Sequence, residues 1–295
     1  MTRPLRELPL RELPREIAPG VWWVGGCLRS NAFEHPVHFH VSAYLIIGAD
    51  KALLYDTAPP ALWAQMDRDL DRLLDGRTLD YVVPSHPEIP HAGNLNKLLD
   101  KFPGAIAIGD MRDYHLYFPD HEHRMQSVPH GTTLDLGGGY KFTLLDAIIE
   151  DLPTTVWGYE HKQQVLFSVD ALGYGHLPQS SPPPQGRPAT HGTEVANVLS
   201  QSCVAIDEPL HAEGECALFA SELDQPPRLE LAAYLTQASL FWSRYVEIGP
   251  FFKRFEALLE QYPARFIAPA HGSVIDDLDI VMPAMRKAHQ QAFIG

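Results

Sequence analysis

The most constraining feature of the sequence is a loop with two histidines and a glutamate, placed directly after a short apolar strand. The loop is Ser85–Asn94 (SHPEIPHAGN), and the strand expected before it is Tyr81–Val83. A loop at a strand end can turn His86, Glu88 and His91 toward one point, where they can hold a metal ion. His86 and Glu88 are two residues apart, so in an extended segment both project to the same side. We therefore expect the chain to fold around a metal and to act through it.

The rest of the chain alternates short apolar strands with amphipathic helices. The expected strands are Val21–Val24, Val41–Ile47, Ala52–Asp56, Tyr81–Val83, Ala105–Gly109, Thr132–Leu136, Tyr140–Ile149, Gln164–Val169 and Phe266–Pro269. The expected helices cover 60–75, Leu95–Phe102, Leu229–Phe241, Pro250–Leu259 and Met282–Ala292. Strands with appended helices in two similar halves predict an α/β fold of four layers, an αββα sandwich.

The pattern predicts one domain over residues 20–295, preceded by an N-terminal arm over 1–19. The arm contains a short repeat, PLREL at 4–8 and again at 9–13, which is too brief to be a solenoid. Residues 178–227 begin with a proline-rich run and have weak periodicity, so we expect them to form a lid or insertion. The arm could contact a second subunit, and a homo-oligomer is expected.

Charge and cysteine usage narrow the classes of function. The formal net charge of −14 argues against a nucleic-acid partner, because a phosphate groove needs Lys and Arg to dominate one face. Three scattered cysteines give neither a disulfide framework nor a thiolate zinc motif, which is typical of a reducing cytoplasm. No apolar run is long enough to cross a membrane. A cytoplasmic protein that acts on small molecules is expected.

Three later residues share one context, a metal-competent side chain at the end of an apolar run. Asp170 follows Val165–Val169, His271 follows 266–270, and Asp151 follows 147–150. A carboxylate at the mouth of a buried strand is costly unless it is paired or bound to a metal. Together with the loop at His86, these residues predict one metal centre rather than separate strand-end caps.

At these positions the chain resembles the metallo-β-lactamase fold, and within it the oxygen-binding diiron branch typified by the catalytic domain of flavodiiron proteins. The matching segments are 42–46 (SAYLI), 54–57 (LYDT), His86–Gly93 (HPEIPHAG), 166–173 (LFSVDALG) and 267–272 (IAPAHG). The resemblance runs from about Gly20 to the C-terminus, interrupted by 178–227.

The resemblance implies a set of iron ligands, and this chain departs from the family pattern at two positions. It carries over to His86, Glu88, His91, Asp170 (bridging both metals) and His271. The family's aspartate between Glu and the second His is Pro90 here, which cannot ligate a metal. The family's remaining histidine falls at Asp151 when the positions are counted back from Asp170 without gaps. Glu150, one residue away, is the alternative, because it could supply a bridging carboxylate.

The implied set divides into two metal positions. One metal would take His86, Glu88 and Asp151 and share Asp170, and the other would take His91, His271 and Asp170. Three histidines with three carboxylates suit two iron ions, with manganese or zinc as alternatives. Pro90 either opens one metal to O₂ or substrate, or leaves a single metal bound.

Two further residues are expected to act at this site without binding a metal. Asp56 is expected to orient a ligand through a hydrogen bond. His40, like His38 beside it, is a candidate for proton delivery.

The resemblance makes a non-haem diiron protein the first hypothesis: it binds or activates O₂ and oxidises a small-molecule substrate, as an oxidoreductase of the oxidase or oxygenase type. Flavodiiron reductases carry FMN on an appended flavodoxin domain. We expect no FMN on this chain and electrons from a separate partner protein. A dinuclear metal hydrolase acting on an ester, thioester or phosphodiester is the second hypothesis. A non-catalytic O₂ or redox sensor is the third.

Overall fold

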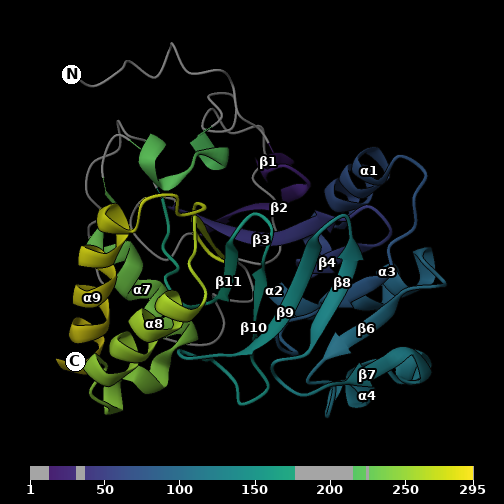
Figure 1. The fold of residues 1–295 in the computed structure, drawn as a ribbon. Helices are drawn as coiled ribbons and strands as arrows, with labels where there is room; N and C mark the ends of the chain where they lie inside the picture. The colour runs from purple at the N-terminus through teal and green to yellow at the C-terminus, as the bar shows by residue number, and fades with distance from the viewer. Residues whose placement is uncertain (1–12, 31–36, 177–214, 224–225, 295) are drawn as a thin grey trace.

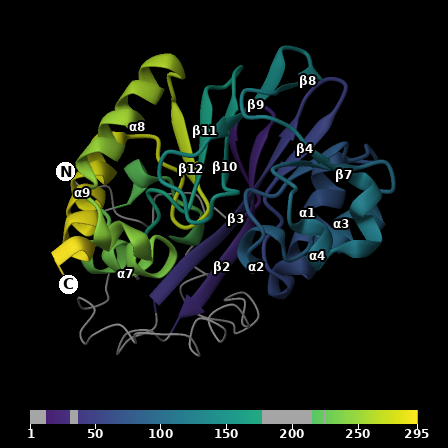
Figure 2. The same cartoon turned by 90° about the horizontal axis from the view of Figure 1, so that it is seen from below.

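The structure is a computed structural model, and it describes residues 13–30, 37–176, 215–223 and 226–294. Two β-sheets lie face to face, with helices on both outer faces (Figures 1 and 2). This is the four-layer αββα arrangement that the sequence predicts. The sheets divide the chain in order, since the first contains β1–β7 and the second β8–β12.

The first sheet has its strands in chain order. They are β1 (Arg15–Ala18), β2 (Val21–Ser30), β3 (Val37–Ile47), β4 (Ala52–Tyr55), β5 (Tyr81–Val83), β6 (Ile106–Gly109) and β7 (Met125–Ser127). Pairing is antiparallel from β1 to β4 and parallel from β4 to β7. Because β4 and β5 are parallel, their carboxyl ends meet at one edge of the sheet, where the loop at His86 begins.

The second sheet is built from the later half of the chain. Its strands are β8 (Thr133–Gly137), β9 (Tyr140–Asp146), β10 (Val156–Glu160), β11 (Val165–Val169) and β12 (Phe266–Pro269), in the order β12-β11-β10-β9-β8. β11 and β12 are parallel, so they too end at a common edge. Asp170 and His271 therefore leave the sheet side by side.

The helices form the two outer layers. On the flank of the first sheet lie α1 (Trp63–Leu74), α3 (Leu95–Lys101) and α4 (Tyr114–Tyr117), and on the opposite flank lie α7 (Leu229–Ser239), α8 (Gly249–Gln261) and α9 (Leu278–Ile294), as Figure 2 shows. The shorter elements are η2 (Pro60–Leu62), α2 (Ile89–Ala92), η3 (Pro119–Arg124), η5 (Glu215–Ala217), η6 (Ala220–Glu222) and η7 (Phe241–Tyr245).

Alternating side chains of the first sheet fill two separate cores. On β3, Tyr44 and Ile46 face the second sheet, whereas Ala43 and Leu45 face the apolar sides of α1 and α3. Both faces of β3 are buried along nearly its whole length, and its last five residues, 43–47, are all apolar.

Described residues at the ends of the predicted arm and lid pack against the rest of the protein. Arg15–Ala18, expected in the N-terminal arm, is strand β1, and Arg15 pairs with Glu222 (N–O 2.6 Å). Residues 1–12 lie outside the described part of the chain, as do 177–214 of the expected lid. The described end of that segment, 216–220, is buried. Among the described residues, no helix is both long and apolar enough to cross a membrane.

Candidate metal centre

Six side chains from both halves of the chain converge between the ends of the sheets. His86 and Glu88 lie in the loop after β5, and His91 lies in α2. Asp151 lies in the loop between β9 and β10, Asp170 directly follows β11, and His271 lies two residues after the end of β12. The strand ends thus place the predicted ligands where the resemblance requires them to meet.

Asp170 lies at the centre of the cluster, with its two oxygens facing different partners. Oδ2 is 3.6 Å from His86 Nε2, whereas Oδ1 is 3.5 Å from His91 Nε2 and 3.1 Å from His271 Nε2. Ligand atoms that share one metal lie about 3.0–3.5 Å apart when metal–ligand bonds are about 2.1 Å. The carboxylate is therefore placed to bridge two cations.

The second set of ligand atoms surrounds His86. Its Nε2 is 3.9 Å from Glu88 Oε2 and 3.9 Å from Asp151 Oδ2, and the three atoms form a group able to hold an ion. The Glu88 side chain is 49% exposed, whereas that of Asp151 is 7% exposed. Glu88 therefore forms the open side of the site.

The buried polar atoms of the cluster lack hydrogen-bond partners. These atoms are His86 Nε2, His91 Nε2 and both carboxylate oxygens of Asp170. Unsatisfied buried polar atoms are rare because each costs free energy. Four of them pointing at one another fit a metal centre, since bound cations would satisfy them all.

Two hydrogen bonds fix which histidine nitrogens face Asp170. His91 Nδ1 lies 2.9 Å from Asp56 Oδ2, and His271 Nδ1 lies 2.7 Å from the backbone oxygen of His40. Each Nδ1–H donates outward, so in the neutral imidazole Nε2 is the nitrogen whose lone pair can face a metal ion beside the carboxylate. This is the arrangement of metal-bound histidines, whose other nitrogen is held by an acceptor. The hydrogen bond expected from Asp56 is present.

The electrostatics of the cluster are those of a site that needs positive charge. Burial, together with the nearby carboxylates of Asp170 and Glu88, raises the pKa of Asp151 to about 8. Burial alone would lower the pKa of His91, but Asp56 and Asp170 outweigh it and hold that pKa well above its usual value. A bound cation favours the charged carboxylates and the neutral histidine.

The backbone around the site is held in a rarely populated conformation. Asp56 has φ of 61° and Val169 has φ of 53°, both in the left-handed region. A β-branched residue there is an outlier, and such strain is found at functional sites. At Val169 the register between β11 and β12 also shifts, and the next residue, Asp170, turns into the cluster.

Two predicted residues lie away from the carboxylates. The His40 ring stacks on His176 (centroids 4.6 Å apart), and its Nε2 is 2.6 Å from the backbone oxygen of Cys216. Only the backbone of His40 contacts a predicted ligand, which favours a positioning role over proton delivery. Glu150 belongs to none of the candidate metal groups, and its backbone oxygen accepts a hydrogen bond from Trp242. The structure therefore brings Asp151, not Glu150, to the cluster.

Sequence reasoning did not predict the backbone acceptor at His40 or a second group of metal-competent side chains. That group consists of Cys27, His38, His176 and Cys216. The sequence signal was weak, because no two of its members are spaced as in a zinc motif. Cys27 and His38 also lie outside the strands expected at Val21–Val24 and Val41–Ile47, and only the longer β2 and β3 bring them together.

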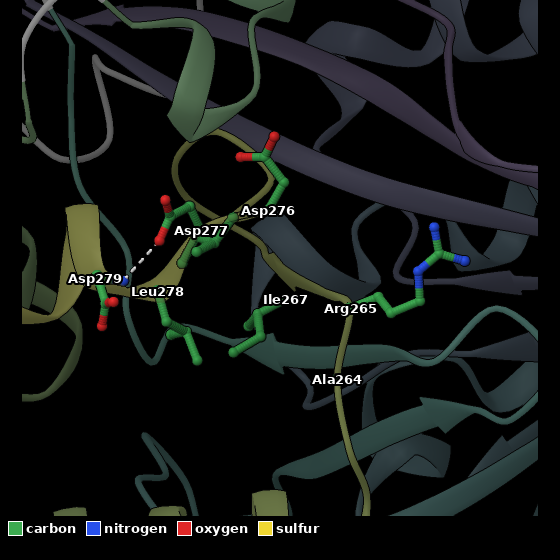
Figure 3. A pocket seen from close by; sticks show the side chains of 8 residues that line it. Ala264, Arg265, Ile267, Asp276, Asp277, Leu278 and Asp279 are labelled. Atoms are coloured by element: carbon green, nitrogen blue, oxygen red, sulfur yellow. Dashed lines mark hydrogen bonds between the residues drawn. The ribbon is translucent and has the colours of Figure 1, made fainter.

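A separate pocket of about 270 Å³ lies beside β12 and the start of α9 (Figure 3). Two of its three aspartates accept backbone hydrogen bonds: Asp277 from the Asp279 amide, and Asp276 from the Ser221 amide. None of the six clustered residues lines this pocket. These hydrogen bonds account for Asp276 and Asp277, and the pocket lies apart from the metal centre.

Comparison with known proteins gives relatives of one kind. The Coenzyme F420H(2) oxidase of Methanocaldococcus jannaschii is 31% identical over 54% of this chain and 40% of that protein. The anaerobic nitric oxide reductase flavorubredoxin of Aliivibrio salmonicida is 30% identical over 43% of this chain and 26% of that protein. The chain thus spans less than half the length of these relatives. Their names describe an oxidase and a reductase, and they do not favour the hydrolase or sensor hypotheses.

Solved structures agree on the fold. Rubredoxin oxygen:oxidoreductase from Desulfovibrio gigas matches with a TM-score of 0.63 at 19% identity, over 94% of this chain and 61% of that chain. A fragment of putative diflavin flavoprotein A 5 from Nostoc sp. matches with a TM-score of 0.64 at 13% identity, over 95% of this chain and 97% of that one. The family model of the metallo-beta-lactamase superfamily matches residues 37–202. The chain belongs to the metallo-beta-lactamase superfamily.

Proposed function

We propose that the six clustered side chains bind two iron ions and that the protein is an oxidoreductase of the oxidase or oxygenase type. In this proposal it binds and activates O₂, or the related small molecule NO, and receives electrons from a separate partner protein. Relatives named as an F420H(2) oxidase and a nitric oxide reductase support redox chemistry over hydrolysis. A small-molecule substrate remains part of the proposal.

The observation that carries the proposal is the position of Asp170. Its oxygens face His86 on one side and His91 and His271 on the other, and neither has a hydrogen-bond partner. A carboxylate with both oxygens buried and unpaired is costly unless each meets a cation. This geometry supports two metal ions, with Asp170 between them.

The donor atoms support iron over zinc at this centre. His91, His271 and Asp170 form a set of two histidines and one carboxylate, which is typical of non-haem iron with open coordination positions. His86, Glu88 and Asp151 add two carboxylates to the other position. Carboxylate-rich sets without thiolates are less usual for structural zinc. When bound, an iron pair would supply the electrons and the vacant positions for O₂ or NO.

Pro90 affects the site because its side chain has no atom that can bind a metal. It lies at the start of the short helix α2, between Glu88 and His91, where its fixed φ suits the first turn. It offers no side-chain donor atom, so the cation held by His91 and His271 has fewer protein ligands than the family pattern implies. We propose that this position receives the small molecule.

Other residues of the chain orient the ligands and limit water. Asp56 and the backbone of His40 hold His91 and His271 in one tautomer, as their hydrogen bonds require. Ser85 directs its amide to Asp56 Oδ1 at 2.8 Å, which fixes that carboxylate in turn. His86, His91 and Asp170 are buried, so small molecules reach the centre on the side of the exposed Glu88.

The test begins with metal content of protein purified and loaded with Fe(II) under anaerobic conditions. About two iron ions per chain are expected from the two positions, with a change in near-ultraviolet absorption when O₂ or NO is admitted. Consumption of O₂ or NO by a chemical reductant should depend on the loaded protein. Zinc bound in preference to iron, with no response to either gas, would contradict the proposal and favour the hydrolase.

Matched variants locate the iron. Asp170→Asn removes one charge from the bridging position and should lose iron binding together with the spectral response. Asp146→Asn makes the same change at an exposed carboxylate of the same sheet and should retain both. Equal iron content in the two variants would exclude Asp170 as a ligand.

A further inference from the structure

A second group of metal-competent side chains lies apart from the carboxylate cluster. Its members are Cys27 on β2, His38 on β3, His176 after β11, and Cys216 in η5. One ligand atom from each lies within 4.8 Å of all the others. Two sulfurs and two imidazole nitrogens form the donor set of structural zinc sites.

The distances between these atoms suit a tetrahedral ion. Around a zinc with Zn–S of about 2.3 Å and Zn–N of about 2.05 Å, neighbouring sulfur and nitrogen ligands lie about 3.5 Å apart. His176 Nε2 lies 3.7 Å from Cys27 Sγ and 3.1 Å from Cys216 Sγ, and His38 Nδ1 lies 3.8 Å from Cys216 Sγ. The atoms therefore need to move only slightly to share one ion.

Strand pairing places three of the four side chains on one face. Cys27 pairs with His40 across β2 and β3, so His38, two residues from His40, lies on the same face as Cys27. His38 and His176 form an isolated antiparallel bridge, with both backbone hydrogen bonds made, at 3.0 and 2.8 Å. The backbone thus holds these donors in place independently of any ion.

Burial and charge favour an ion at this position. Cys27, His38 and Cys216 are buried, at 3%, 0% and 7% exposure, and the two cysteines contact each other. A divalent cation bound by two thiolates and two neutral imidazoles has no net charge, so burying the complete site avoids the cost of an isolated charge.

We propose that Cys27, His38, His176 and Cys216 bind one zinc ion in a structural site. All four tetrahedral positions are filled by protein, so the ion has no open position for a substrate. The soft thiolates select zinc here, whereas the carboxylate cluster suits a harder ion. The His40 ring supports the site through its stacking on His176 and its contact with the Cys216 backbone.

The proposed zinc ion would connect segments that lie far apart in the sequence. His176 and Cys216 are separated in sequence by residues 177–215, and both would bind the ion that Cys27 and His38 hold on the first sheet. The zinc would therefore join two points that are far apart in the sequence to β2 and β3. Because the complete site exists only in the folded chain, its binding free energy adds to the stability of the native state.

The test compares two variants, one expected to lose zinc and the other expected to lose iron. The full chain is loaded with Zn(II) and Fe(II) without oxygen, and both metals are measured. Cys216→Ser should lose one zinc per chain and retain iron, whereas Asp170→Asn should lose iron and retain the zinc. A Cys216→Ser variant that folds and retains its zinc would overturn the proposal.

Measurements on the wild-type chain keep the proposal testable if the cysteine variant does not fold. Cobalt(II) in place of zinc should give thiolate-to-cobalt charge-transfer absorption and the visible bands of a tetrahedral ion. Zinc should slow the reaction of two thiols with a disulfide reagent, and a chelator should restore their rate. The proposal would be contradicted if the thiolate band is absent or if the thiols react equally fast with and without zinc. A disulfide joining Cys27 to Cys216 would also contradict it.

Discussion

The Asp56 carboxylate accepts two hydrogen bonds, one on each oxygen, so even its replacement by asparagine should disturb the site. Its Oδ1 accepts the Ser85 amide and its Oδ2 faces His91 Nδ1. Asn has a single oxygen, so Asp56→Asn leaves one of the two donors unsatisfied. We expect metal affinity to fall by about 10–100-fold, the usual effect of losing a hydrogen bond to a ligand.

Iron binding measured by anaerobic titration checks this expectation. Asp146→Asn provides the control, because its side chain is 68% exposed and it makes no contact with the cluster among those described. Affinity unchanged in Asp56→Asn would show that His91 needs no orientation or is not a ligand.

His289 predicts a pH dependence of stability that is independent of the metal centre. Burial lowers its pKa to about 4, and its ring packs edge-on against Phe252. Between that value and the usual 6.5, the unfolded chain binds the proton and the folded chain does not. Stability is therefore complete above pH 6.5 and is lost as the pH falls toward 4, by about 3 kcal/mol in total.

Replacing His289 with Leu should remove this part of the acid sensitivity. The measurement is the free energy of unfolding in urea across that pH range, on metal-free protein. His123→Leu, at an exposed histidine, should behave as the wild type does. A wild-type slope retained in His289→Leu would refute the assignment.

At the scale of elements, β10 depends on a glycine to admit an aromatic ring between the sheets. A Cβ at Gly158 would lie 2.2 Å from Phe142 Cζ, and Phe142 is fully buried against Tyr55 and Phe167. The ring cannot withdraw, so Gly158→Ala should destabilise the fold by about 1–3 kcal/mol.

Thermal or urea unfolding measures the effect, and Gly104→Ala serves as its control. A Cβ added at Gly104 would meet no atom within 4 Å, so the same substitution there should change stability little. Equal effects of the two substitutions would mean that Phe142 does not restrict β10.

Strand ends were the part of the site that the sequence predicted best. Val165–Val169 and Phe266–Pro269 are apolar runs that stop at Asp170 and His271, and both strands are present with those bounds. Asp151 was indicated both by the apolar run before it and by the family spacing, but the strand expected to reach Ile149 ends at Asp146, so Asp151 lies in a loop. β10 was missed because Gly158 interrupts its apolar pattern.

The Cys–His group marks the limit of sequence reasoning at this scale. Cys27 and His38 become neighbours only through the pairing of β2 with β3. His176 joins them through a bridge between segments far apart in the chain. Contacts of this kind depend on the tertiary fold, and neither periodicity nor spacing records them.

At the scale of the whole molecule, metal binding should stabilise the fold because the ligands come from both halves. His86, Glu88 and His91 belong to the first half, whereas Asp151, Asp170 and His271 belong to the second. Free metal at a hundredfold excess over its Kd adds about 2.7 kcal/mol to the free energy of unfolding. The Tm should rise by several degrees.

Calorimetry of the anaerobic protein with and without Fe(II) tests this. Asp170→Asn, which lacks the bridging charge, should show a smaller rise at the same concentration. An unchanged Tm in the wild type would mean that the metal, if bound, does not discriminate the folded from the unfolded chain.

The division of ligands between the halves also sets an order of events during biosynthesis. A nascent chain that has completed β1–β7 carries three of the six clustered side chains, and Asp170 follows only after four more strands. His271 comes after β12, the last strand of the second sheet. Neither centre is complete when the first sheet leaves the ribosome. If the chain binds iron as proposed, complete metal binding would be a late step of maturation, and iron supply would affect the finished protein rather than its early folding.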